Sequence, residues 1–238
     1  ITMADHNGRS YGEALVLFVA VDIGGTFTDL VAFDDETGKL FDAKRLTTYG
    51  NFADGIFDCF ANSGLEPETA TQIIHGSTIA INTLIERKGA RTALLVTRGT
   101  RDVYAIGRGN RPDSYNLFFK RPKPLTPRSD IYEVDERMLA GGIVHQSVDE
   151  TQIVSIGREL AARGFQSAAV CFLHSYANPA HEVQVGNILR SQLKDTYVSL
   201  SHEILREYRE YERISTTAVN AYIGPRVSGY VSSLAQDL

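Results

Sequence analysis

The chain has 238 residues, 43% of them hydrophobic, and a formal net charge of -5. This size and apolar content suit one large or two small α/β domains of a soluble globular protein. The sequence has no basic tract that would favour nucleic acid, and the apolar run over 14–21 is too short to cross a bilayer and follows no basic signal-peptide start, so we expect a cytosolic protein.

Hydrophobic periodicity predicts a mixed α/β architecture, with a mixed sheet flanked by helices. Three apolar segments joined by short turns predict antiparallel strands, and helical and strand patterns alternate after them. The segment 98–128, rich in Arg, Gly, Asn and Pro, is expected to be a long functional loop. Gly224-Pro225 is expected to break or kink the last helix. We expect strands at 14–21, 30–33, 39–46, 71–75, 91–97, 131–134, 167–172 and 197–201, and helices at 52–60, 78–88, 153–162, 182–193 and 208–234.

A tight turn after the first strand carries an acid, two glycines and two hydroxyls. Gly24 and Gly25 allow backbone N–H groups to approach a ligand that a Cβ would keep away. Thr26 and Thr28 add hydroxyl donors, and Asp22 can hold a hydrated Mg²⁺ that neutralises phosphate charge. The pattern therefore predicts a site for a metal-nucleotide complex. The alternative interpretation is a plain hairpin turn in which Asp22 is a capping residue.

A second candidate site lies where a short strand feeds a helix. His75, Gly76 and Thr78 stand at that junction, and the free N–H groups of a helix start suit an anion or a carbonyl oxygen. Alternatively, Ser77 or Thr78 is only the N-cap of the helix. The local pattern leaves both interpretations open.

Three polar residues of the long loop form a third candidate. Arg108, Asn110 and Arg111 could bind a substrate carboxylate or phosphate oxygens, since an arginine fork matches both groups. The local pattern favours the alternative, in which they are solvated loop charges.

Several acids and histidines further along the chain could hold a metal only if the fold brings them together. His174 follows a buried strand, at the edge of the sheet where ligands collect in α/β folds. No pair of these residues has the spacing of metal ligands. The set is Asp135, Glu136, His174, His202 and Glu203.

Seven segments, taken in order, resemble the amino-terminal part of the hydantoinase A and 5-oxoprolinase family. The resemblance covers residues 19 to about 230. Ser77 departs from it slightly, since the family more often has Thr there. The segments are DIGGTFTD at 22–29, HGSTIAINTLIERKG at 75–89, VTRGTRD at 96–102, GRGNRP at 107–112, YEVDER at 132–137, LHSYANPAHE at 173–182 and LSHEILREYREYERISTTAVNAYIGP at 200–225.

This resemblance implies the fold of the actin, sugar kinase and Hsp70 superfamily, in which two ribonuclease-H-like domains clamp ATP. It implies ATP and Mg²⁺ as cofactors, with the metal held by Asp22 through water, and phosphorylation of a carbonyl oxygen in a cyclic amide of the hydantoin or 5-oxoproline type. The expected phosphate-binding residues are Asp22, Gly24, Gly25, Thr26 and Thr28, the expected catalytic residues Asp22, Thr26, His75 and Thr78, and the expected substrate-binding residues Gly76, Ser77, Arg108, Asn110 and Arg111.

The resemblance also implies a domain organisation and two alternative functions. We expect a leader at 1–18, an N-terminal domain at 19–196 and the start of a catalytic domain at 197–238, in a chain that is part of a longer protein. The alternatives are a subunit of an ATP-dependent acetone or acetophenone-type carboxylase and a nucleotide-binding regulatory module of the actin and Hsp70 superfamily. Because such enzymes commonly work with a B-type subunit, we expect a partner subunit and an oligomer.

Overall fold

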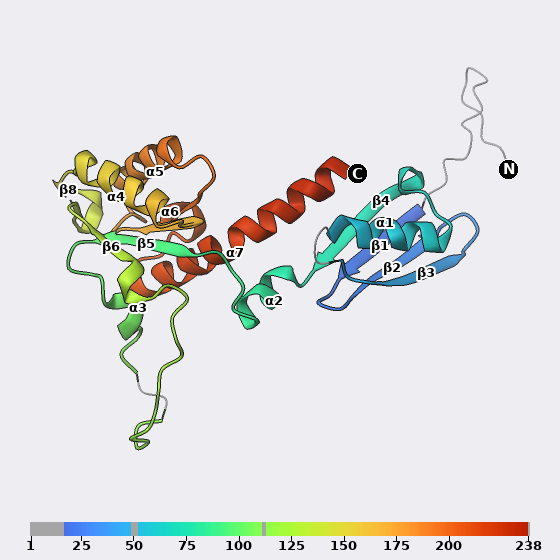
Figure 1. Cartoon of the computed structure of the whole chain (residues 1–238), viewed down its shortest axis with the longest axis horizontal. Coiled ribbons are helices and arrows are strands. Elements are labelled where there is room, and N and C mark those ends of the chain that lie inside the picture. The colour runs from blue at the N-terminus through green and yellow to red at the C-terminus, as the bar shows by residue number, and fades with distance from the viewer. Residues whose placement is uncertain (1–16, 49–51, 111–112, 238) are drawn as a thin grey trace. The chain divides into compact units, whose positions relative to one another are not determined.

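The computed structural model describes residues 17–48, 52–110 and 113–237 (Figure 1). The chain forms two compact units, the first made of Ile1–Ile85 with Val227–Leu238 and the second of Glu86–Arg226. Most of the leader expected at 1–18 lies outside the described residues. The domain boundary expected near residue 197 stays a prediction.

The first unit contains a four-stranded sheet with the strand order β3-β2-β1-β4. The strand β1 (Leu17–Ile23) pairs antiparallel with β2 (Phe27–Asp34) and parallel with β4 (Ala70–Ser77). The strand β3 (Leu40–Leu46) lies antiparallel to β2, and α1 (Phe52–Ser63) connects β3 to β4. Since β1 is central, the turn that follows it lies between two neighbouring strands.

The two faces of this sheet differ because successive strand residues point to opposite sides. On one face β1 packs against α1, while the other face carries exposed apolar residues such as Phe18, Val31 and Phe33. Asp22 belongs to this exposed face, because it alternates with buried neighbours in β1. The buried side is formed by Leu17, Val19, Val21 and Ile23 of β1 with Ile56, Cys59 and Phe60 of α1.

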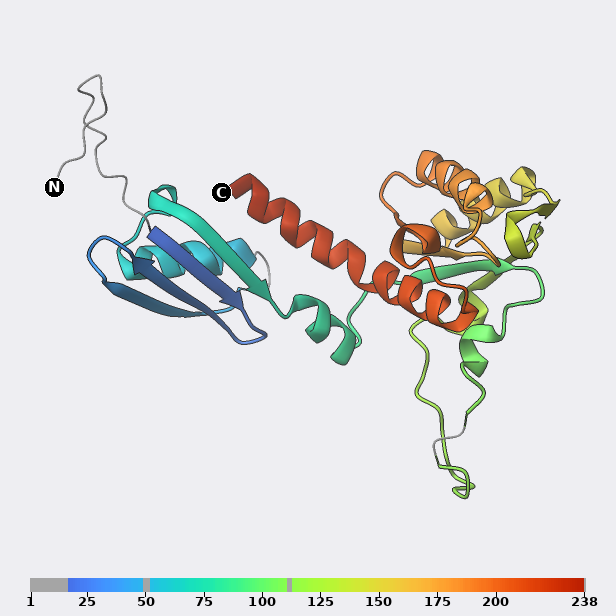
Figure 2. The ribbon, with the colours of Figure 1, turned by 180° about the vertical axis from the view of Figure 1, so that it is seen from behind.

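The second unit contains a parallel sheet with the order β10-β9-β5-β6. Its helices α4 and α5 cover one face and the first part of α7 covers the other (Figure 1, Figure 2). A small hairpin of β7 and β8 and the short helices α3 and α6 complete the unit. The bounds are β5 (Thr92–Thr97), β6 (Ile131–Val134), β9 (Ser167–Cys171), β10 (Tyr197–Leu200), α3 (Val103–Ile106), α4 (Glu150–Ala162), α5 (Ala180–Gln192), α6 (Ser201–Ile204), α7 (Glu210–Asp237), β7 (Arg137–Met138) and β8 (Val144–Gln146), and α2 (Ile79–Ile85) follows β4 in the first unit.

The expected mixed α/β architecture is confirmed, with several departures in detail. The last helix continues through Gly224-Pro225 as a single α7, although Pro225 offers no N–H to the carbonyl of Ala221. The long loop contains α3, and the hairpin of β7 and β8 was not predicted because its strands are too short for a periodic pattern. None of the helices in the described part of the chain combines the length and the apolar character that a membrane crossing requires.

Packing around α7 gives a matched pair of glycine substitutions. A Cβ added at Gly224 would lie 2.6 Å from Cζ and 2.8 Å from Cδ1 of the Tyr197 ring, whereas one added at Gly229 meets nothing within 4 Å. Gly224→Ala should therefore lower the free energy of unfolding by about 1–3 kcal/mol. Gly229→Ala, in the same helix, should raise it by about 0.5–1 kcal/mol. Urea unfolding followed by circular dichroism measures both, and equal stability of the two variants would contradict this packing.

Candidate functional site

The parallel pairing of β1 with β4 brings the first two sequence motifs to one edge of the sheet. Asp22 stands beside Gly76 and Ile23 beside Ser77 in the register of the two strands. The next residue along, Thr78, donates from its backbone N and its Oγ1 to the carbonyl oxygen of Ile23, at 3.1 Å and 3.3 Å. The glycine turn after β1 and the start of α2 thus lie side by side. We call this region, Asp22–Thr26 with Gly76–Thr78, the turn edge.

The glycine turn is held closed by its own backbone and by Thr47. The N–H of Gly24 donates to the carbonyl oxygen of Phe27 at 2.9 Å, which closes the hairpin between β1 and β2. Thr47 donates from Oγ1 to the carbonyl of Gly24 at 3.0 Å and from its N–H to the carbonyl of Thr26 at 2.9 Å. The N–H of Gly24 is therefore engaged within the turn and does not offer a donor to a ligand.

At two positions of the turn edge a neighbouring side chain lies so close to the backbone that only glycine fits without a shift. A Cβ at Gly25 would lie 2.9 Å from Nδ2 of Asn82, and a Cβ at Gly76 would lie 3.1 Å from Oδ1 of Asp22. Asn82 in turn donates from Nδ2 to Oγ1 of Thr78 at 3.0 Å. Sequence reasoning missed Asn82, although a polar residue one helical turn after Thr78 on an apolar helix is a signal that could have revealed it.

The predicted phosphate-binding residues fall into three groups by their exposure to solvent. Asp22 and Thr26 are exposed, and Gly24 and Gly25 are half-buried. Thr28 is completely buried, and its Oγ1 lies 3.4 Å from Oγ1 of Thr47. Its side chain points to the α1 side because it alternates with exposed neighbours in β2. The hydroxyl of Thr28 therefore supports the turn from inside and does not reach a ligand at its surface.

His75 lies on the opposite face of the sheet from Asp22. In the strand register His75 stands beside Val21, whose side chain is buried on the α1 side, and its Nε2 contacts the hydroxyl of Tyr230. Burial lowers the pKa of the His75 imidazole, partly offset by the backbone of Val21 and the charge of Asp22. The imidazole is consequently neutral at neutral pH. The structure thus places the His75 side chain on the face opposite to the carboxylate of Asp22.

The third candidate set lies in the second unit. Arg108 donates from Nε to Oε1 of Glu212 at 2.7 Å, as an exposed ion pair. The carbonyl oxygen of Asn110 accepts from Nη2 of Arg121 at 3.2 Å. Arg111 lies outside the described residues.

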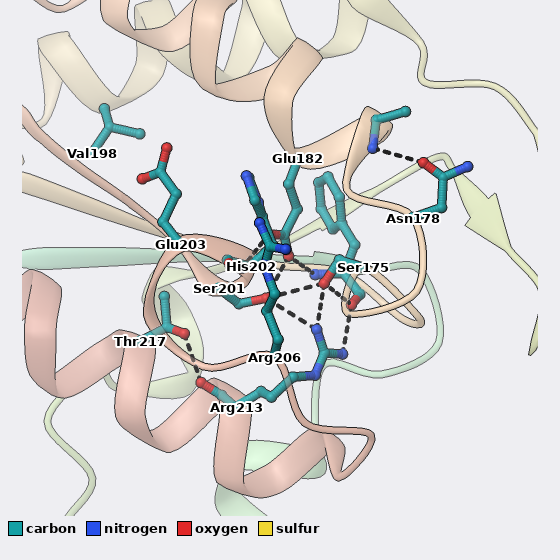
Figure 3. A network of polar contacts seen from close by, with 12 residues as sticks. Ser175, Asn178, Glu182, Val198, Ser201, His202, Glu203, Arg206, Arg213 and Thr217 are labelled. Atoms are coloured by element: carbon teal, nitrogen blue, oxygen red, sulfur yellow. Dashed lines mark hydrogen bonds and ion pairs between the residues drawn. The ribbon is translucent and has the colours of Figure 1, made fainter. Parts of the chain in front are cut away.

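A buried polar cluster closes the carboxyl edge of the parallel sheet between β9 and β10 (Figure 3). Its centre is Glu182, which is fully buried and accepts from Oγ of Ser201 at 2.6 Å and from Nδ1 of His202 at 2.8 Å. It also accepts from the backbone N–H of His202 and of Phe172, both at 2.9 Å. Arg213 donates to the carbonyl of Phe172 at 2.7 Å and to Ser201 at 3.0 Å. We call these residues the Glu182 cluster.

The carboxyl group of Glu182, at the centre of the cluster, is ionised. Burial opposes ionisation, but the hydrogen bonds from His202, Ser201 and the Phe172 backbone outweigh it and hold the pKa of Glu182 below its usual range. Because an ionised carboxylate only accepts, Nδ1 of His202 carries the proton of their hydrogen bond. The hydrogen bonds of the cluster connect the end of β9 with α5, α6 and α7. The cluster therefore has a structural role.

The set of acids and histidines considered for a metal does not converge. Among the described residues there is no group of three or more His, Cys, Asp or Glu side chains placed to hold a metal ion. Glu136 instead binds Nδ1 of His181 at 2.7 Å, and Glu203 pairs with Arg190 at 3.1 Å. Asp135 pairs with Arg98. Each of these acids satisfies a nearby cation or imidazole, so the alternative of a metal site in the second unit is not supported.

Most of this chain is similar in sequence to known proteins. A family model for the hydantoinase/oxoprolinase N-terminal region matches residues 18–193. An uncharacterized protein of Methanocaldococcus jannaschii is 37% identical over 223 residues, covering 92% of this chain and 33% of that protein. The caprolactamase subunit alpha of Pseudomonas jessenii is 31% identical, covering 91% of this chain and 32% of that subunit.

Solved structures agree with the sequence comparison. The nucleotide-free structure of an acetone carboxylase, from work on ATP-dependent acetone carboxylation, is similar with a TM-score of 0.82 at 26% identity, covering 94% of this chain and 34% of that one. The crystal structure of the ATP-dependent caprolactamase from Pseudomonas jessenii has a TM-score of 0.78 at 30% identity, covering 92% and 33%. The fold expected from the resemblance is confirmed, and the chain spans about a third of the length of these relatives.

The Glu182 cluster generates a stability prediction. Glu182→Gln should lower the free energy of unfolding by about 2–4 kcal/mol at pH 7, because it removes a buried charge that its donors and Arg213 surround. The matched control Glu203→Gln, an exposed acid of α6, should change it by less than about 1 kcal/mol.

The same variant should show a characteristic pH dependence. A lowered carboxyl pKa adds stability above the usual glutamate value of about 4.3, and this stability is lost as the pH falls through the folded value. The stability difference between the parent chain and Glu182→Gln should therefore shrink as the pH falls from 7 to below about 4. Chemical unfolding across this range measures it, and a constant difference would mean that Glu182 is not ionised in the folded chain.

Proposed function

Because the chain belongs to the hydantoinase/oxoprolinase family, whose N-terminal region it matches, we propose that it takes part in the ATP-dependent activation of a carbonyl group. The proposed reaction is hydrolysis of a cyclic amide of the hydantoin or 5-oxoproline type. ATP dependence is stated for the caprolactamase and for the acetone carboxylation of the similar structures, and it supports the same requirement here.

The observation that carries the proposal is the convergence of two motifs at the turn edge. The exposed carboxylate of Asp22 stands beside Gly76, and the exposed hydroxyl of Thr26 lies in the adjacent turn. The absence of a Cβ at Gly25 and Gly76 lets the side chains of Asn82 and Asp22 approach the backbone closely. An exposed carboxylate and an exposed hydroxyl at one edge fit a magnesium-bound triphosphate.

We assign separate roles to the residues of the turn edge. Asp22 would hold Mg²⁺ through water, and when bound the ion supplies neutralisation of the phosphate charge. Thr26 would donate to the terminal phosphate. Thr78, whose backbone N–H and Oγ1 both donate to the Ile23 carbonyl, would fix the start of α2 beside the turn. Thr28 and His75 are positioning residues in this proposal, because Thr28 is buried and His75 is on the other face.

The chemistry follows from the poor reactivity of an amide carbonyl. The γ-phosphoryl group of ATP moves to the carbonyl oxygen, so that the bond to ADP breaks as the new P–O bond forms. Water then adds to the activated carbon, the ring C–N bond breaks, and a second water releases phosphate. Positioning and charge neutralisation supply most of the rate. In the first unit, Gly76 and Ser77 would contact the substrate.

A second candidate function is that of an ATP-dependent ketone carboxylase subunit. The TM-score of 0.82 to the acetone carboxylase favours it. Here the phosphorylated oxygen would belong to an enolate, and bicarbonate would be consumed. Since the caprolactamase relative is an alpha subunit, we further propose that the chain works with a second type of subunit in an oligomer.

The deciding experiment measures ADP release by a full-length protein that contains this chain, expressed with its candidate partner subunit. Hydantoins, 5-oxoproline and ketones are supplied with and without bicarbonate. Release with a cyclic amide, independent of bicarbonate, is expected. Release only with a ketone and bicarbonate selects the carboxylase, and release that is indifferent to every substrate contradicts both enzyme functions.

Substitution at the turn edge tests the residue assignment. Asp22→Asn in the same assembly should lower kcat by about two orders of magnitude or more, because the metal loses its charged support. The matched control Asp35→Asn, in the exposed turn between β2 and β3, should leave kcat unchanged. Undiminished turnover in Asp22→Asn would remove Asp22 from the mechanism.

A further inference from the structure

A cleft in the second unit is lined by none of the residues assigned to phosphate. Its volume is about 630 Å³, and it is formed by α3, Gly107, Asn110, residues 119–125 and the first turns of α7. Three aromatic side chains line it, those of Tyr104, Phe119 and Tyr211. This volume falls within the range of about 300–1,000 Å³ that is usual for small-molecule pockets.

The cleft carries positive charge without an acid beside it. Arg121 and Lys123 line it, and among the residues described by the structure no carboxylate does. Arg121 donates to the carbonyl oxygens of Ile106 and Asn110, which are neutral acceptors and leave its charge uncompensated. The cleft therefore favours an anionic ligand.

Hydroxyl donors complete the lining. Burial raises the pKa of the Tyr104 phenol, so this group remains protonated and able to donate at neutral pH. Tyr211 and Ser215 also line the cleft. Aromatic faces, hydroxyls and two cations together suit a ligand with a flat ring at one end and a negative charge at the other.

We propose that this cleft binds a small aromatic carboxylate, with the ring against the aromatic side chains and the carboxylate toward Arg121 and Lys123. Arg121 and Lys123 can both donate to the two oxygens of one carboxylate, whereas a nucleoside triphosphate brings three phosphate groups and a larger charge. The inference is independent of the reaction proposed above, because it requires neither ATP nor the turn edge.

The test is isothermal titration of the chain with benzoate in the absence of nucleotide. A dissociation constant on the order of 1 mM is expected for a ligand of this size. Benzamide, which keeps the ring and loses the charge, and cyclohexanecarboxylate, which keeps the charge and loses the flat ring, should each bind at least about fivefold more weakly. A separate titration with ATP tests whether the cleft binds a nucleotide instead of benzoate.

Matched variants locate the binding. Lys123→Gln should weaken benzoate binding about five- to tenfold. The control Lys194→Gln, an exposed lysine of the same unit, should leave it unchanged. Phe119→Leu should narrow the preference for benzoate over cyclohexanecarboxylate, and circular dichroism of each variant confirms that it is folded.

The titrations distinguish results that support the proposed binding from results that overturn it. Loss of binding in Lys123→Gln alone, with discrimination between the three ligands, supports the proposal. Absence of benzoate binding, equal loss in the Lys194→Gln control, or ATP binding to the cleft in place of benzoate overturns it. None of these results depends on whether Asp22→Asn affects turnover, so the proposed function stands or falls separately.

Discussion

The parallel pairing of β1 with β4 is the constraint on which the turn edge depends. It sets Asp22 beside Gly76, and it places Thr78 within hydrogen-bonding distance of the Ile23 carbonyl. The pairing joins segments that are separated along the chain by two strands and a helix. A shift of one residue in the register would turn Asp22 toward α1 and bury its carboxylate among apolar side chains, so the exposed acid exists only because the register is fixed.

The second unit uses its polar groups differently. At the carboxyl ends of β9 and β10, where parallel sheets commonly bind ligands, the Glu182 cluster fills the space with the chain's own donors and acceptors. A fully satisfied buried carboxylate rigidifies the elements that share it. A concave surface of this unit lies instead beside residues 119–125, where aromatic and cationic side chains gather.

The sequence predicted those features that arise from local patterns. The glycine turn and the strands of the parallel sheet depend on residues close together in the chain, and all of these elements are present. Features that depend on distant contacts were not predicted. The role of Asn82 follows from its approach to Gly25, and the face on which His75 lies follows from the register of β4. The continuity of α7 through Pro225 likewise depends on packing, which outweighs local helix propensity.

The contact between Gly76 and Asp22 has a consequence for how this part of the chain can evolve. A Cβ at position 76 would lie 3.1 Å from Oδ1 of Asp22, so the acid and the glycine occupy one shared volume. A lineage that acquires a side chain at position 76 has to move or shorten the one at position 22, and a longer acid at position 22 leaves still less room. A substitution at either position is therefore expected to require an adjustment at the other, although more than fifty residues of sequence separate them.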